Sequence, residues 1–189
     1  APGDGAEPPN WRLIVPPGSI RFEDQFAGPR GFDPSLIVGD YVIWTRRRQP
    51  SYQLAVVVDD HRQGVTQVVR GDDLLDSAAR QLLLYRTLGL RPEPEYTHLP
   101  LVRGHDGKRL AKRHGDTRLE RYRAMGVPAE AVVGLVARWC GIGSPHAAPE
   151  PMTAERFMSA LDLSTIPAEP VTFTHEDDQW LLSQVAKTV

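Results

Sequence analysis

Alternating apolar and polar residues divide the first part of the chain into short predicted strands. The segments WRLIV and SIRFED are rich in β-forming residues and are separated by a Pro-Pro-Gly breaker, which predicts two strands paired as a hairpin. A cluster of Gly and Pro follows over residues 28–34. After it, DYVIWTRRR places apolar side chains on both faces with a period of two, which predicts a third strand.

The segment YQLAVVVDDH is compatible with two structures. Its run of Val favours a strand on propensity, whereas the spacing of Leu54, Val57, Val58 and His61 also fits the apolar stripe of a helix. Both structures remain open at this point.

A strand, loop and helix follow directly and predict half of a βαβ unit. VTQVVRG has the length and composition of a short buried strand. The helix AARQLLLYRTLG is expected to be capped by Ser77, to bury Leu82, Leu83 and Tyr85, and to stop at Gly89. YTHLPLV then supplies the next predicted strand.

The hydrophobic period becomes helical from residue 116 onward. The predicted helices are TRLERYRAMG, PAEAVVGLVARWCG, TAERFMSALD with Thr153 as cap, and HEDDQWLLSQVAKT with Thr174 as cap. The pattern therefore predicts an α/β chain in three parts. These parts are a disordered start over residues 1–10, an α/β core over 11–115 and a helical domain over 116–189.

Composition narrows the classes of protein without selecting one. The chain has 189 residues, 41% of them hydrophobic and 24% charged, with a formal net charge of −2, which is ordinary for a soluble globular protein. Its single cysteine, Cys140, excludes an internal disulfide framework and the usual cysteine zinc site, and favours a reducing environment. No window approaches the roughly 18 apolar residues of a membrane span, so a cytoplasmic protein is expected.

A basic loop is the first candidate for chemistry. Lys108, Arg109, Lys112, Arg113 and His114 lie within seven positions and are flanked by glycines, after a predicted strand and an Asp-Gly turn. Cations on such a loop suit the negative charge of a nucleotide triphosphate, because phosphoryl chemistry depends on positioning and electrostatics. The alternative is a solvated basic turn.

Arg70 is the second candidate, because it ends a predicted apolar strand. Ligands of open α/β sheets bind at the carboxyl edge of the strands, and a guanidinium fork matches a carboxylate. The alternative is an ion pair between Arg70 and the neighbouring Asp72 or Asp73.

Other polar residues give weaker signals. Asp59 and Asp60 are adjacent and point in different directions on regular structure, so a capping or solvated role is favoured over a shared proton. The six histidines lack metal-ligand spacing and are expected to be surface or satisfied core residues, so no metal site is predicted. The serines lack a nucleophile context.

Five ordered blocks resemble the class I glutamyl-tRNA synthetase family. They are YQLAVVVDDH, GVTQVVRGDDLL, ARQLLLYRTLG, YTHLPL and KRLAKRHG, and the resemblance runs from about residue 40 to residue 115. It implies the C-terminal part of a Rossmann-like catalytic domain followed by a small all-helical domain like the stem-contact domain. The ending DLSTIPAEPVTF resembles the short glutamyl-queuosine tRNA(Asp) synthetase branch.

The resemblance also implies substrates and site residues. The family activates L-glutamate with ATP, with Mg²⁺ expected, and transfers it to tRNA; in the short branch the acceptor is the queuosine of tRNA(Asp). The glutamate-binding positions fall on Tyr52 and Arg70. The ATP-binding loop falls on Arg109, Leu110, Ala111, Lys112 and Arg113, with Lys112 as the catalytic cation.

Three departures from the family pattern accompany the resemblance. The N-terminal half with its HIGH-type motif has no counterpart, the zinc-binding cysteines of the short branch are absent, and the loop serine is Ala111. We therefore expect these residues to be an inactive part of a longer enzyme. The alternatives are a truncated, non-catalytic paralogue that binds tRNA or a partner, and a fragment of a full glutamyl-tRNA synthetase.

Overall fold

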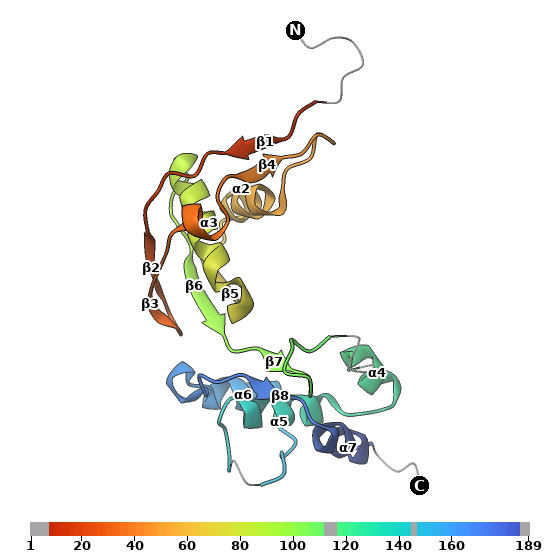
Figure 1. Ribbon diagram of the computed structural model, residues 1–189. Helices are drawn as coiled ribbons and strands as arrows, with labels where there is room; N and C mark the ends of the chain where they lie inside the picture. The colour runs from red at the N-terminus through yellow and green to blue at the C-terminus, as the bar shows by residue number, and fades with distance from the viewer. Residues whose placement is uncertain (1–7, 112–116, 145–146, 186–189) are drawn as a thin grey trace. The chain divides into compact units, whose positions relative to one another are not determined.

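The computed structural model describes residues 8–111, 117–144 and 147–185. It divides into two compact units, Ala1–Leu99 and Pro100–Val189 (Figure 1). The sequence pattern predicted a boundary between the α/β core and the helical domain after residue 115. The difference arises because the segment Val102–Arg103 does not extend the first sheet but pairs with Val171–Thr172 in the second unit.

The first unit is built on a mixed four-stranded sheet. Its elements in chain order are β1 (Trp11–Leu13), β2 (Ile20–Asp24), β3 (Gly28–Phe32), α1 (Pro34–Ile37), β4 (Tyr41–Trp44), α2 (Tyr52–Gln63), β5 (Gln67–Gly71), η1 (Asp72–Leu74), α3 (Leu75–Thr87) and β6 (Glu95–Leu99). The sheet order is β3-β2-β6-β5, in which β2, β6 and β5 are parallel and β3 is antiparallel to β2. The predicted α/β class and the strand–helix–strand unit β5-α3-β6 are confirmed.

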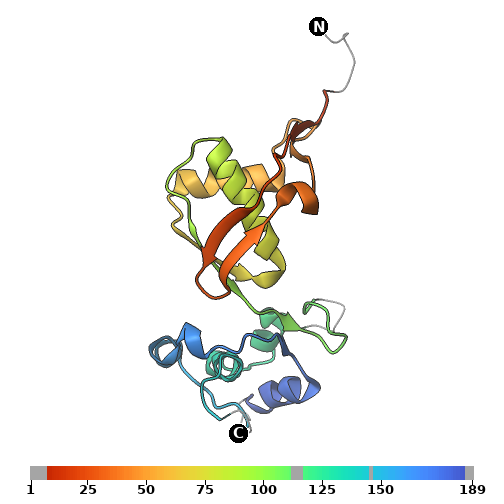
Figure 2. The same ribbon diagram turned by 60° about the vertical axis from the view of Figure 1, so that its left-hand side comes forward.

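Helix α3 packs against this sheet (Figure 2). Ala78, Leu82 and Tyr96 form a buried cluster between the helix and the strands. A second buried cluster joins α2 to α3 through Val57, Leu84 and Tyr85. The two clusters explain why α3 is buried on much of its circumference.

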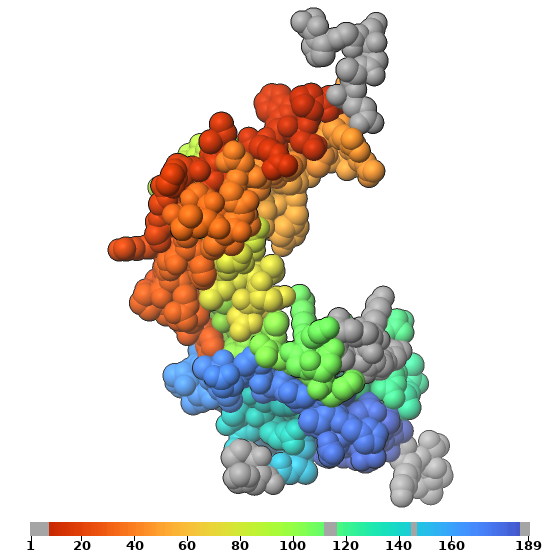
Figure 3. Space-filling model, in the orientation of Figure 1, coloured from red at the N-terminus to blue at the C-terminus, as the bar shows by residue number. Residues whose placement is uncertain are grey.

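The predicted hairpin between the first two strands is wrong. Strand β1 pairs with β4, so the residues near 12 and near 42 lie side by side (Figure 3), and β2 pairs with β3 instead. The Gly and Pro cluster over residues 28–34, in which no strand was predicted, thus contains β3. Pro29 is tolerated there because β3 lies at the edge of the sheet, where a missing backbone N–H breaks no ladder.

The ambiguous segment after residue 51 is a helix. Its Val residues pack against α3 with Val57 fully buried, and Gly64 ends the helix in the left-handed conformation at φ +70°. Tertiary packing therefore overrides the β propensity of Val. The predicted cap Ser77 is also wrong, since α3 begins at Leu75 and Ser77 is buried inside its first turn, whereas Gly89 follows the end of α3 as expected.

The second unit is mostly helical, as predicted, but it also contains a short sheet. Its elements are β7 (Val102–Arg103), α4 (Leu119–Ala124), α5 (Ala129–Trp139), α6 (Ala154–Ala160), η3 (Leu163–Thr165), β8 (Val171–Thr172) and α7 (His175–Ser183). The expectation of an all-helical domain is corrected by β7 and β8, which are parallel. Two residues per strand leave no periodic pattern to detect in the sequence.

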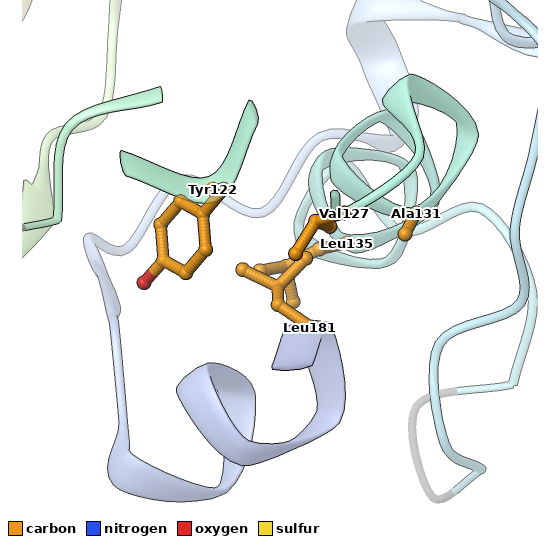
Figure 4. Packing of buried hydrophobic residues seen from close by; sticks show 5 residues of the cluster. All are labelled: Tyr122, Val127, Ala131, Leu135 and Leu181. Carbon is orange, nitrogen blue, oxygen red and sulfur yellow. The ribbon is translucent and has the colours of Figure 1, made fainter. Parts of the chain in front are cut away.

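The core of the second unit lies between α4, α5 and α7 (Figure 4). Tyr122, Val127, Ala131, Leu135 and Leu181 make up its buried cluster. The segment before α6 also crosses α5, because the Met152 N–H donates to the Glu130 carbonyl at 2.8 Å. This crossing places backbone directly against the helix at Gly134.

Thr174 caps α7 as predicted, and the cap offers a test of local stability. Its hydroxyl accepts from the Asp177 N–H at 3.2 Å, and the Asp177 carboxylate accepts from the Thr174 N–H at 3.0 Å, which completes a capping box. We expect Thr174→Ala to lower the free energy of unfolding by about 1 kcal/mol in urea denaturation. Thr174→Ser keeps the oxygen and serves as the control; an equal loss in both variants would contradict the cap's role.

Candidate functional site

Arg70 lies at the carboxyl end of β5, where its guanidinium donates to three acceptors. Nε donates to His98 Nε2 at 2.9 Å, Nη1 to Gln81 Oε1 at 2.9 Å, and Nη2 to the Leu74 carbonyl at 3.2 Å. All three acceptors are neutral groups: an amide oxygen, a backbone carbonyl and the Nε2 of an uncharged imidazole, because a protonated imidazole nitrogen cannot accept a hydrogen bond. Within the described residues, these bonds replace the ion pair with Asp72 or Asp73 that the sequence left open.

A buried pair of side chains from the two neighbouring strands supports Arg70. Asp24 ends β2 and His98 lies near the end of β6; both are 1% exposed, and His98 Nδ1 is 2.6 Å from Asp24 Oδ2. The other carboxylate oxygen, Asp24 Oδ1, accepts from the N–H groups of Phe26, Ala27 and His98. Three parallel strands therefore bring Asp24, His98 and Arg70 together at one edge of the sheet.

The same network continues into helices α2 and α3 of the first unit. Gln81 of α3 accepts from Arg70, and its amide nitrogen donates to Gln53 Oε1 of α2 at 3.0 Å. The Tyr96 ring lies under the guanidinium, with Arg70 Cζ 5.2 Å from the ring centroid, and stacks on His98. The guanidinium is thus held from three directions.

The electrostatic surroundings of Arg70 include Tyr52 and Asp60. Burial lowers the pKa of Arg70, and the opposing effects of Tyr96, Tyr52 and Asp60 are smaller. Burial likewise raises the pKa of the Asp60 carboxyl, which Arg70 partly counteracts. Tyr52 begins α2 with its side chain 62% exposed. The two positions expected to bind glutamate thus belong to one unit.

The Asp24 carboxyl makes the stability of the fold depend on pH in the acid range. Burial opposes its ionisation, but hydrogen bonds from Ala27, His98 and Phe26 outweigh burial and hold its pKa below the usual value. A lowered folded-state pKa stabilises the fold above the unfolded value of about 3.9, and this contribution is lost as the pH falls below it. Urea denaturation between pH 6 and pH 3 is expected to show a steeper loss of stability in the native chain than in Asp24→Asn. Equal slopes would contradict this assignment.

The basic loop begins as a hairpin in the second unit. Leu110 N–H donates to the Val102 carbonyl at 2.9 Å, and Gly104 N–H donates to the Lys108 carbonyl at 2.8 Å. The backbones of Arg103 and Arg109 form an antiparallel β-bridge. Gly107 makes the turn at φ +72°. Of the predicted loop residues, Arg109, Leu110 and Ala111 are described, whereas Lys112 and Arg113 lie outside the described residues.

Sequence reasoning missed the residues that support Arg70. His98 was assigned as a surface or satisfied core residue, and it is indeed buried and hydrogen-bonded, but its partner Asp24 was not singled out. Gln53 and Gln81 carry no motif. Asp60 was expected to be solvated or capping; once α2 is known to be helical, its eight-residue separation from Tyr52 places both on one helix face.

Two further observations concern metal ligands and membrane-spanning helices. In the described ranges, no three His, Cys, Asp or Glu side chains are grouped as the ligands of a metal ion would be. None of the helices there has both the length and the apolar character needed to cross a membrane.

The fold agrees with comparisons to known proteins. The sequence profile described as tRNA synthetases class I (E and Q), catalytic domain, matches residues 5–180. The chain therefore belongs to the class I tRNA synthetases of the glutamate and glutamine group. The resemblance identified from the five blocks is confirmed at the level of the family.

Individual relatives agree with this assignment. The chain is 48% identical over 168 residues to the glutamyl-Q tRNA(Asp) synthetase of Symbiobacterium thermophilum, covering 89% of the chain and 50% of the relative. It is 42% identical to glutamate–tRNA ligase 1 of Cereibacter sphaeroides, covering 81% and 31%. The glutamate–tRNA synthetase structure from Elizabethkingia anophelis superposes with a TM-score of 0.71 at 27% identity, covering 90% and 37%. The chain thus spans half the length, or less, of these relatives.

Proposed function

We propose that this chain is part of an enzyme that activates L-glutamate with ATP and transfers it to tRNA. The observation that carries the proposal is the half-buried Arg70 guanidinium, whose hydrogen bonds within the described residues go to neutral acceptors. A desolvated cation without a carboxylate partner favours an anionic ligand. Glutamate, the amino acid named for the relatives, supplies such a carboxylate.

In this proposal Arg70 and Tyr52 bind glutamate. The guanidinium retains N–H groups for a carboxylate, and the exposed phenol of Tyr52 supplies a further polar contact. The role of Arg70 is to hold and orient the amino acid, so that one α-carboxylate oxygen can attack the α-phosphorus of ATP while the bond to pyrophosphate breaks.

The ATP-binding residues in this proposal are Arg109, Leu110, Ala111, Lys112 and Arg113. Arg109 and Lys112 would oppose the negative charge of the triphosphate, with Lys112 stabilising the charge that develops during transfer. Mg²⁺ would accompany the ATP phosphates, as is usual for this ion. Ala111 lacks the hydroxyl of the family's loop serine, so the backbone and the cations would have to supply the contacts there.

ATP–pyrophosphate exchange with the full-length gene product tests the activation step. We expect exchange that depends on L-glutamate and that is weak with L-glutamine. Glutamine has a neutral amide in place of the side-chain carboxylate that Arg70 would bind. Absence of exchange with every amino acid would overturn the enzymatic function and favour a non-catalytic module that binds tRNA or a partner.

The acceptor is proposed to be the queuosine of tRNA(Asp). Support comes from the relatives named glutamyl-Q tRNA(Asp) synthetases, which are 48% and 50% identical over the matched residues. Transfer of labelled glutamate should then require tRNA(Asp) that contains queuosine and fail with unmodified tRNA(Asp). Charging of tRNA(Glu) instead would assign the chain to a glutamate–tRNA ligase.

A further inference from the structure

The hydrogen bonds around Arg70 determine which nitrogen of His98 carries the imidazole proton. A guanidinium only donates, so His98 Nε2 must accept the bond from Arg70 Nε at 2.9 Å. Neutral His98 then carries its proton on Nδ1 and donates it to Asp24 Oδ2 at 2.6 Å. The direction of each bond between β2, β6 and β5 is therefore determined by chemistry.

We propose that Asp24 and His98 are positioning residues that orient Arg70 for a substrate carboxylate. Asp24 fixes the tautomer of His98, and His98 fixes the guanidinium through Nε, while Gln81 and the Leu74 carbonyl each bind one Nη group. Arginine has five N–H groups, and three of them bind the described residues. One N–H on Nη1 and one on Nη2 therefore remain for a ligand. This inference rests on the proposed function, because it assumes that Arg70 binds glutamate.

Asp24→Asn tests the tautomer with almost no change of shape. Oδ1 accepts from three backbone N–H groups, so the oxygen of the new amide must stay on that side and its NH₂ must take the place of Oδ2. The NH₂ would donate to His98 Nδ1, which moves the imidazole proton to Nε2. That proton would face the Arg70 Nε–H across 2.9 Å, and two donors cannot share a hydrogen bond.

His98 offers a matched pair of substitutions. The amide oxygen of His98→Gln reaches the position of Nε2 and retains an acceptor for Arg70. His98→Asn reaches only the position of Nδ1 and leaves Arg70 Nε without an acceptor. The two variants are similar in polarity and differ mainly in which partner they preserve.

Nitrogen-15 NMR of the 189-residue chain measures the tautomer directly. At pH 7 we expect His98 in the wild-type chain to show a protonated Nδ1 and an unprotonated Nε2, and we expect the opposite in Asp24→Asn. A wild-type His98 with its proton on Nε2, or with both nitrogens protonated, would overturn the proposal. This readout needs neither glutamate nor activity.

Steady-state exchange kinetics with the full-length gene product measure the consequence. We expect Asp24→Asn and His98→Asn to raise KM for L-glutamate about tenfold or more, the range for losing a hydrogen bond to a charged group, with KM for ATP and kcat nearly unchanged. His98→Gln should stay within a fewfold of wild type. Equal increases in KM for both substrates would indicate a general structural defect and overturn the positioning role.

Arg70→Ala separates this inference from the proposed function. If Arg70→Ala raises KM for glutamate while Asp24→Asn and His98→Asn do not, the positioning role is overturned and the function of Arg70 stands. If Arg70→Ala leaves KM for glutamate unchanged, Arg70 is not the carboxylate receptor, and the inference falls with it.

Discussion

Replacing Arg70 with alanine is expected to weaken L-glutamate binding about 30-fold or more, since truncating one partner of a desolvated charge pair costs about 2–5 kcal/mol. ATP binding should change far less. The reason is that the guanidinium is half-buried and its hydrogen bonds to the described residues go to neutral groups, so a bound carboxylate would be a directly hydrogen-bonded charge partner. KM values for glutamate and ATP in pyrophosphate exchange, measured on the full-length gene product, check this expectation.

Arg70→Lys is the matched control for charge against geometry. Lysine keeps the positive charge but loses the planar fork and the bonds to His98 and Gln81, so its KM for glutamate should lie between wild type and Arg70→Ala. Equal losses of glutamate and ATP affinity in both variants would point to a collapsed fold instead. Circular dichroism and urea denaturation of each variant would identify that case.

Replacing Gly134 with alanine is expected to destabilise the second unit strongly. An added Cβ would lie 2.0 Å from the Glu150 carbonyl oxygen, 2.8 Å from its carbon and 3.1 Å from Pro151 Cα, all of them backbone atoms. Helix propensity alone would favour alanine by about 1 kcal/mol. The overlap must instead displace the crossing segment, and we expect a net loss of about 1–3 kcal/mol or more, in the upper range of overpacked cores.

Urea denaturation of the chain measures this effect, and Val136→Ala is its control. Val136 lies on the same helix, α5, with 36% exposure, so that substitution should change stability by less than about 1 kcal/mol. A Gly134→Ala variant as stable as wild type would mean that the segment of Glu150 and Met152 does not cross α5 so closely.

Local signals in the sequence predicted the elements whose structure depends on neighbours along the chain. The strand containing Arg70, the helix that ends before Gly89, and the caps Thr153 and Thr174 all followed from periodicity and end chemistry. Pairing of β1 with β4, and of β7 with β8, could not be predicted in this way. Those partners are distant in sequence, and short strands carry too little pattern to identify them.

The candidate site was predictable to a similar degree. Arg70 could be singled out because one residue at the end of an apolar strand carries an interpretable signal. Asp24 and His98 could not, because their roles depend on three strands from different parts of the chain ending at one edge. A buried carboxylate and a buried imidazole look like ordinary polar residues until their contact is known.

Because β7 pairs with β8, the start of the basic loop is held in place by residues about 70 positions later in the chain. The hairpin that carries Arg109 begins at β7, and the parallel neighbour of β7 is Val171–Thr172, immediately before the last helix. Phe173 N–H also donates to the Arg103 carbonyl at 2.9 Å, next to this hairpin. Shortening the protein to a residue before 171 would therefore detach the scaffold of the basic loop, even though every loop residue would still be present.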